Sequence, residues 1–457
     1  MRSQPAGKPE TQPSRTTEPR RLLHNAAGII GLYAVLVLYM FAQRYMLEHW
    51  LSKTYSYFLM AYDNWRSDTY FWICILTPLS VLPTGSRLES ASHFILPIFM
   101  TFVCLPTPLF LVHFVPEAVY WPFYGCLFLS YAILAVSTRL TFKRIPSPLT
   151  ERGYVKLLAA TLILFAIVFA VGGTQSFHLV DFARLYEVRY SDEAAGVLVQ
   201  RFAVLYVFCF GGLFFSLCLM FKRKFLAVLT MLVYVVCYGL LQYKAAILAP
   251  FWFAYIYVLV KYFNRTSAIK YYLALAIPLY VGVVVFMLFP SGANAGGNLL
   301  EFAFLGLVVF RLYGVTANAT GLYYTYFQSH EHTYWSHITG INFFVDYPYG
   351  DHTVAIEMER FYGLGNYNSS FIATEGIASY GYQALPVVSL VVGALFVIMN
   401  TAARGIGPQV LALLMIMPGL LIDERPLGTS LLTGGLIFLV LYLAWMPRNW
   451  LARSQDI

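Results

Sequence analysis

The stretch Ala26–Leu47, which reads AAGIIGLYAVLVLYMFAQRYML, decides the class of fold. Its 22 residues include one charge, Arg44. As a helix rising about 1.5 Å per residue, they cover the roughly 30 Å hydrocarbon core of a bilayer. No small-residue cleavage site follows, so we expect an uncleaved anchor rather than a signal peptide. Residues 1–25 are rich in Pro, Ser, Thr, Gln and Arg and lack an apolar period, so they are expected to form a disordered tail.

The composition of the whole chain points the same way. Of its 457 residues, 59% are hydrophobic and 11% are charged, whereas soluble domains carry about 25% charged residues. This balance excludes a soluble enzyme, a nucleic-acid-binding module and a disordered scaffold. The six cysteines all lie within apolar runs, so neither a disulfide framework nor a zinc motif is predicted.

Eleven further apolar runs follow, which makes twelve expected spans and an all-α polytopic membrane protein. The runs at 70–83 and 409–422 are short, and the first is compatible with a re-entrant segment. The others lie near 93–114, 117–137, 155–172, 197–221, 225–241, 245–260, 271–290, 384–402 and 429–446.

The distribution of basic residues predicts the orientation. If the N-terminus is cytoplasmic, the alternating inside segments hold 20 lysines and arginines and the outside segments hold 8. This excess is the one that the positive-inside rule requires, so both termini are expected in the cytoplasm. A thirteenth span at 299–310 breaks the alternation. We therefore expect that stretch to be a helix lying on, or dipping into, the outer interface.

One connection is much longer than the others. Residues 291–383 are expected to form a single outer, periplasmic segment. It follows the first nine spans (26–290) and precedes the last three (384–446) and a short cytoplasmic tail (447–457). From Arg311 to Gln383 it carries 17 aromatic residues, which is not the composition of a disordered chain. Because loops of this length are usually functional or disordered, we expect a partly helical segment that folds over the outer mouth of the bundle.

Four basic residues, Arg201, Lys244, Arg311 and Arg425, fall at outer ends of spans or helices. Together they could form a cationic ring at the outer membrane surface. Such a ring suits a lipid-linked phosphate or pyrophosphate, because guanidinium groups match phosphate oxygens. The alternative for each residue is snorkelling to ordinary lipid headgroups.

The segment Gly363–Tyr382, GLGNYNSSFIATEGIASYGY, holds one acid, Glu375, just before an apolar run. Its glycines and asparagines permit tight backbone turns. A carboxylate at the mouth of an apolar bundle can act as a general base. The alternative is a glycine-hinged loop in which Glu375 caps or pairs structurally.

This segment and the following span resemble the signature of bacterial oligosaccharide repeat-unit (O-antigen, Wzy-type) polymerases. The stretch Arg311–Phe327, continuing to Tyr334-Trp335-Ser336-His337, and the element Gln242-Tyr243-Lys244 are similar to further parts of that family's pattern. The resemblance covers roughly residues 235–450. The residues that follow Asn366 depart from the pattern.

The resemblance implies a metal-independent glycosyltransferase of GT-C-like polymerase or ligase architecture in the bacterial inner membrane, without a cofactor. Its substrates would be undecaprenyl-pyrophosphate-linked oligosaccharides, and a flippase and a chain-length regulator would be partners. Glu375 or His337 would serve as base, and Arg311 would join them at the reacting centre. Arg311 and Arg360 would bind pyrophosphate, supported by Lys244, Arg201 and Arg425. Glycan contacts would come from Tyr323, Tyr324, Trp335 and Tyr367, for each of which an interfacial aromatic belt is the alternative.

Two other functions stay open. A GT-C glycosyltransferase that uses a polyprenyl-phosphate sugar would employ Asp63 or Asp68, and a chelator would abolish its activity. Twelve spans also suit a transporter or flippase, although no repeat relates the two halves. The histidines at 330, 332, 337 and 352 fit no strong zinc motif, so we predict no metal site.

Overall fold

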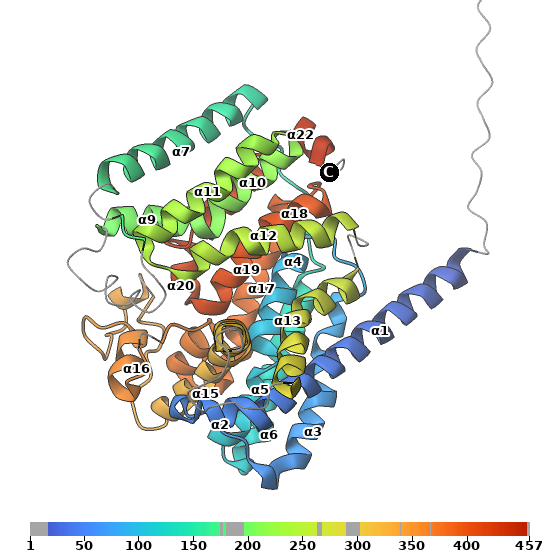
Figure 1. The fold of residues 1–457 in the computed structure, drawn as a ribbon, viewed down its shortest axis with the longest axis vertical. Helices are drawn as coiled ribbons and strands as arrows, with labels where there is room; N and C mark the ends of the chain where they lie inside the picture. Colours follow the sequence, from blue (N-terminus) through green and yellow to red (C-terminus); the bar gives the residue numbers. More distant parts are fainter. Residues whose placement is uncertain are drawn as a thin grey trace, which may run out of the picture.

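The computed structural model describes residues 17–173, 177–179, 196–262, 267–288, 302–338, 340–365 and 367–454 (Figure 1). Within these ranges the chain is helical, and the one β-type contact is an isolated bridge between Arg87 and Ser267. This confirms the all-α prediction. Most of the tail 1–25 and residue Asn366 lie outside the described residues.

Eleven helical stretches in the described part are long and apolar enough to cross a membrane. Ten of them coincide with predicted spans, which confirms a polytopic membrane protein. The ten are α1 (Thr17–Met46), α4 with η6 and α5 (Ala91–Phe99, Met100–Cys104, Thr107–Phe114), α6 (Glu117–Ser137), α7 (Glu151–Gly172), α9 with η7 and α10 (Val197–Leu205, Tyr206–Phe210, Gly211–Met220), α11 (Lys224–Leu241), α12 (Lys244–Tyr262), α13 (Ala268–Leu288), α17 (Leu385–Ala402), and α20 with α21 (Leu427–Leu431, Leu436–Ala444). The eleventh is η8 with α15 (Phe302–Val315, Thr316–Phe327).

The helices on the outside of the bundle expose apolar side chains. Helix α7 lies along one edge (Figure 1) and buries only Tyr154 and Phe165. Its Ile163 and Val171 are 59% and 78% exposed. A soluble protein rarely leaves so large a continuous apolar surface in water, whereas lipid-facing helices do so by necessity.

The connecting segments gather at two opposite ends of the bundle. At the end that we call the tail end, the start of α4, the end of α6 and the C-terminal residues lie together. The pairs joined there by hydrogen bonds are Ser86 with Ala268, Thr138 with Asn400, and Gly407 with Ser454. Every one of these residues lies in or beside a segment that the basic residues assign to the inside.

At the other end, which we call the site end, the segments assigned to the outside meet. The contacts there join the first connection to the end of α5, the start of α12 to the segment 423–428, and that segment to the long connection. The pairs are Asp63 with His113, Tyr243 with Glu424, and Gly428 with Glu375. The two sets of segments are therefore separated by the length of the helices.

The two short predicted runs both reach from one end to the other. The first consists of α3 (Ser67–Leu76), η4 (Thr77–Ser80) and η5 (Leu82–Thr84). A 3₁₀-helix rises about 2 Å per residue against about 1.5 Å in an α-helix, so this segment covers roughly 30 Å. Pro78 and Pro83 lie in the first turns of the two 3₁₀ pieces, where a missing N–H costs nothing.

The second short run is α18 (Pro408–Leu414) followed by α19 (Ile416–Glu424), with a break at Met415. Gly407 bonds Ser454 at the tail end, and Glu424 accepts from Tyr243 at the site end. The first run also reaches both ends, because Asp63 before it contacts His113 at the site end and Ser86 after it bonds Ala268 at the tail end. These contacts do not fit a re-entrant segment at 70–83. Both segments run end to end, although neither is a single long helix.

The stretch 299–310 belongs to a longer helix than the sequence indicated. Residues Phe302–Phe327 form one continuous helix, η8 followed by α15. In its first half Gly306 lies against Tyr55 and Phe310 stacks on the same ring (centroids 3.6 Å apart), and near its finish Tyr324 contacts Phe123 (5.3 Å). Both partners belong to the site end, and in Figure 1 the yellow-orange coil of η8 is seen end on while its neighbours run across the view. The helix therefore starts and finishes at the same end of the bundle.

Candidate functional site

Glu375 lies inside the site end rather than at an open mouth. It belongs to η10 (Ile372–Ala378), a π-helical turn of the kind often found at functional sites, and it is 1% exposed. Its Oε2 accepts from Thr374 Oγ1, and its Oε1 accepts the Gly428 N–H at 3.4 Å. A buried carboxyl needs such partners, because burial without them is costly.

His337 lies beside this carboxyl. Its Nε2 is 3.9 Å from Glu375 Oε1, and its Nδ1 is 3.0 Å from Thr333 Oγ1. The Thr333 hydroxyl also lies 3.3 Å from the Ala378 carbonyl. When Thr333 donates to that carbonyl, it can accept from Nδ1–H, which leaves Nε2 facing Glu375 with a free lone pair. If Thr333 donates to Nδ1 instead, Nε2 carries the proton and faces Glu375 as a donor.

The turn that carries His337 is strained. Tyr334 and Trp335 have φ angles of 45° and 62°, in the left-handed region that side chains other than glycine avoid. Each costs on the order of 1–2 kcal/mol. The turn is held by Thr333 N–H and Tyr334 N–H, which donate to the Ala378 and Ser379 carbonyls at 2.8 and 3.0 Å. Strain of this kind persists where surrounding contacts impose it, and it is common at functional sites.

Trp335 ties the turn to the acid. Its indole N–H donates to the Glu375 carbonyl at 2.9 Å, and its ring lies nearly parallel to that of Tyr380, with centroids 6.5 Å apart. The structure therefore brings together three residues that the sequence singled out separately: Glu375, His337 and Trp335.

The segment 423–428 connects this cluster to a second one. Gly428 bonds Glu375, and three residues earlier the Arg425 guanidinium lies over the rings of Tyr243 (5.5 Å) and Phe208 (5.8 Å). The Tyr243 hydroxyl donates to Glu424 Oε2 at 2.5 Å. Lys244, the first residue of α12, follows Tyr243 directly. Arg425 and Lys244 thus belong to two segments that contact each other, one of which also bonds the acid through Gly428.

Asp423 directly precedes Glu424 in the second cluster and, like Glu375, is deeply buried. It is 2% exposed, and neither of its carboxyl oxygens has a hydrogen-bond partner among the described residues. Arg425 Nε is likewise buried without a hydrogen-bond partner there. Ionisable groups left in this state at membrane depth are costly, so they usually mark function.

Arg311 lies elsewhere at the site end. It is close to Tyr55, Tyr57 and Tyr367: burial raises the pKa of Tyr55 to about 12, and the neighbouring Arg311 opposes that rise. Burial also raises the pKa of the Tyr367 phenol. Arg311 is thus placed among aromatic residues of the first and the long connections.

The predicted glycan contacts divide into buried and exposed groups. Tyr323 is fully buried and donates to the Tyr367 carbonyl at 3.0 Å, and Tyr324 and Tyr367 are each 5% exposed. These three hold the long connection against the bundle. Trp335 alone of the four is partly accessible next to the acid.

Two of the predicted pyrophosphate ligands are exposed. Arg360 lies on α16 (Val354–Tyr362), 3.5 Å from Glu357 one turn earlier, and Arg201 lies on the exposed side of α9. Their described contacts include none of the other predicted cations. The contacts given for the predicted cations thus differ: aromatic rings for Arg425 and Arg311, and Glu357 for Arg360.

Sequence reasoning passed over Arg66. This residue is 4% exposed, and its Nη1 donates to the carbonyls of Val112 and Val115 at the end of α5. A cation at a helix C-terminus is favoured by the helix dipole and satisfies otherwise unpaired carbonyls. Its position in an aromatic-rich connection gave no sign of this role.

The histidines of the long connection do not converge. His330 stacks on Tyr326 and His332 on Phe327, while His337 bonds Thr333. Among the described residues no group of three His, Cys, Asp or Glu side chains is placed to hold a metal ion.

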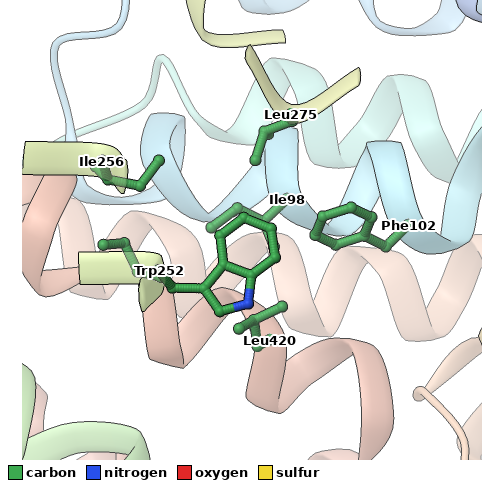
Figure 2. Close-up of a pocket in the computed structure, with 7 residues that line it drawn as sticks. Ile98, Phe102, Trp252, Ile256, Leu275 and Leu420 are labelled. Atoms are coloured by element: carbon green, nitrogen blue, oxygen red, sulfur yellow. The ribbon is translucent and has the colours of Figure 1, made fainter. Parts of the chain in front are cut away.

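The crevice drawn in Figure 2 lies away from these polar groups. It is entirely apolar, lies between α4, η6, α12, α13 and α19, and is too narrow for a water molecule. Trp252, Phe102 and Leu420 are among the side chains that line it. None of the predicted site residues lines it.

Fold and site together define an all-α, multi-pass membrane protein with a buried acid–histidine pair at one end of its bundle. No family model, no curated protein and no solved structure matches the chain.

Proposed function

We propose that the chain crosses the bacterial inner membrane twelve times, with the site end in the periplasm and both termini in the cytoplasm. The twelve crossings are the ten long helices already predicted plus the segments 67–84 and 408–424. Helix 302–327, which has both ends at the site end, is the periplasmic element that dips into the bundle. The basic residues support this orientation, since their excess lies in segments assigned to the tail end.

We further propose that the protein is a polysaccharide polymerase. In this proposal it transfers a growing glycan from undecaprenyl pyrophosphate to a lipid-linked repeat unit. The observation that carries the proposal is the Glu375–His337 pair, 3.9 Å apart and buried at the site end. GT-C-like architecture and the polymerase family remain parts of the same proposal, supported by the sequence resemblance.

The reaction has to break the bond between the sugar C1 and the pyrophosphate oxygen and to form a bond between C1 and an acceptor hydroxyl oxygen. The hydroxyl proton must pass to a base. A hydroxyl oxygen about 2.8 Å from both His337 Nε2 and Glu375 Oε1 fits between two atoms that are 3.9 Å apart. In the tautomer with Nε2 protonated, His337 donates to the hydroxyl oxygen and Glu375 Oε1 accepts the hydroxyl proton as the general base.

The leaving group is an undecaprenyl pyrophosphate, which gains negative charge as the bond to C1 breaks. A cation near the pair stabilises that charge. Arg425 is the predicted cation best placed for this, because Gly428 of the same segment bonds Glu375. Lys244, at the start of α12 beside Tyr243, supports it. Arg311, Arg360 and Arg201 lie in other surroundings and are proposed only as headgroup contacts.

The test is an assay with purified protein and a lipid-linked oligosaccharide, with and without EDTA, in which products are read as a gel ladder. We expect a ladder that survives EDTA. A single added sugar that EDTA abolishes would favour the GT-C glycosyltransferase, for which Asp63 is the candidate acid and lies 3.3 Å from His113. No product from any lipid-linked donor would overturn the polymerase and favour transport.

A matched pair of variants locates the activity. Arg425→Ala should remove most of the ladder, while Arg360→Ala, which changes an exposed cation paired with Glu357, should leave it intact. Equal loss in both variants would contradict the assignment of Arg425 to the leaving group. A normal ladder with Arg425→Ala would do so as well.

A further inference from the structure

The side chains around the strained turn leave an aromatic surface open beside the acid. Tyr334 and Tyr380 are 43% and 55% exposed. Their rings are 6.1 Å apart at 64°, and the Tyr380 ring lies within 7° of parallel to that of Trp335. Three rings therefore form one angled surface, which we call the 334–380 platform.

The platform is fixed relative to Glu375. The indole N–H of Trp335 donates to the Glu375 carbonyl, and Tyr334 N–H donates to the Ser379 carbonyl, one residue before Tyr380. Movement of either segment, 333–335 or 375–380, would break hydrogen bonds to the other. An aromatic ring used only to anchor the protein in lipid needs no such connection to a buried carboxyl.

Polar atoms without hydrogen-bond partners lie next to the platform. His332, whose ring centroid is 6.4 Å from that of Tyr334, has a buried Nδ1 with no hydrogen-bond partner among the described residues. His337 Nε2 is in the same state. Aromatic walls with a few convergent polar groups are the usual composition of small-molecule sites.

We propose that the 334–380 platform is a carbohydrate subsite that holds the terminal acceptor sugar over the Glu375–His337 pair. That the bound sugar is the acceptor rests on the proposed function, but sugar binding itself does not need transfer activity. The C–H face of a pyranose ring carries partial positive charge, so it is complementary to the negative face of an aromatic ring. His332 and His337 would then bond the hydroxyl groups at the edge of that sugar.

The choice of residues at the turn supports this reading. Glycine or asparagine would adopt the left-handed conformation of positions 334 and 335 with little strain. The chain instead has Tyr334 and Trp335 there. Their side chains are therefore kept in spite of the backbone, which is expected when the rings themselves contact a ligand.

The experiment is binding of the full-length protein, in lipid nanodiscs, to an array of soluble, lipid-free oligosaccharides. Tyr380→Ala should weaken binding of the best glycans about tenfold, the scale of one aromatic contact. Tyr380→Phe should restore it, because the ring face is retained. Phe344→Ala is the matched control, since Phe344 is 89% exposed in the same connection but makes no ring contact with the platform.

Two results would overturn the proposal: a wild-type protein that binds none of the arrayed glycans, or a Tyr380→Ala protein that binds them as wild type does. The array separates this inference from the polymerase. Glycan binding that depends on Tyr380 in a protein that makes no ladder would retain the subsite and reject the polymerase. If Tyr380→Ala made a ladder with a normal KM for the acceptor, the polymerase would be retained and the subsite rejected.

Discussion

At the tail end Asn400 uses its whole amide, whereas at the site end Asp423 uses none of its carboxyl. Asn400 Oδ1 accepts from Ser92 N–H at 2.9 Å, and Nδ2 donates to the Thr138 and Leu140 carbonyls at 3.0 and 3.2 Å. Both residues are 2% exposed. The same degree of burial is therefore combined with full hydrogen bonding at one end and with none, among the described residues, at the other.

The contrast extends to other groups. At the tail end Arg144 donates to the carbonyls of Arg404, Leu443 and Met446, which closes the ends of neighbouring segments. At the site end, buried nitrogens of His332 and His337 lack hydrogen-bond partners among the described residues. Gln409 Oε1 and His93 Nε2 at the tail end also lack partners among the described residues, so the comparison concerns these individual groups and has to be tested variant by variant.

The strongest way to break this comparison is to change one acid at each end. Glu375→Gln keeps the shape of the buried side chain but removes the base, so the rate of ladder formation should fall about 10²- to 10⁴-fold. Glu151→Gln is the matched control at the tail end, where the carboxylate accepts from Trp450 Nε1 at 2.8 Å and from Asn449. It should leave the rate unchanged. Initial rates from the gel ladder measure both, and equal losses would contradict the assignment of the site.

A second variant tests whether the tail end is purely structural. Asn400→Leu leaves Ser92 N–H and the Leu140 carbonyl without partners and removes one of the two donors to the Thr138 carbonyl, so the free energy of unfolding should fall by roughly 3 kcal/mol. The activity per folded molecule should not change. Labelling of the buried thiols, such as Cys104, by a maleimide dye during heating reports the loss of structure. A variant with normal stability but little activity would place function at the tail end.

A third variant tests whether Asp423 is kept for function. Asp423→Leu removes a buried carboxyl without partners, so stability should rise by about 1–3 kcal/mol while ladder formation falls. Gln409→Leu is the tail-end counterpart, because Gln409 Oε1 is also buried without a partner among the described residues. It should gain stability and keep activity. Asp423→Leu with full activity would show that the buried acid is not needed.

The sequence alone predicts the helices and both sets of connections, because hydropathy and basic residues act over whole segments. It also selects Glu375, His337 and Trp335, since each is unusual where it stands. It could not place them together: His337 and Glu375 are 38 positions apart, and their contact depends on the turn at 334–335 pairing with Ala378 and Ser379.

The predicted cationic ring shows the limit most clearly. Arg201, Lys244, Arg311 and Arg425 share a sign and an expected depth, but a ring also needs a common position around the bundle. That position depends on helix rotation and neighbours, which hydropathy does not encode. The role of Arg66 could not be predicted because its partners are backbone carbonyls, which every residue has and which the sequence therefore does not mark.

The smallest expected effect compares two strained residues, one at each end. Lys222, between α10 and α11 at the tail end, and Tyr334 have φ angles of 57° and 45°. Lys222→Gly and Tyr334→Gly should each raise the free energy of unfolding by about 1 kcal/mol, because glycine adopts this region without strain. Only Tyr334→Gly should also weaken the glycan-dependent reaction. Thermal labelling of the buried cysteines gives the first quantity, and the KM for the lipid-linked acceptor gives the second. If both variants gained stability and kept the same KM, the backbone strain at Tyr334 would have no role in the reaction, as at Lys222. The two ends would then not differ in the use of a strained residue.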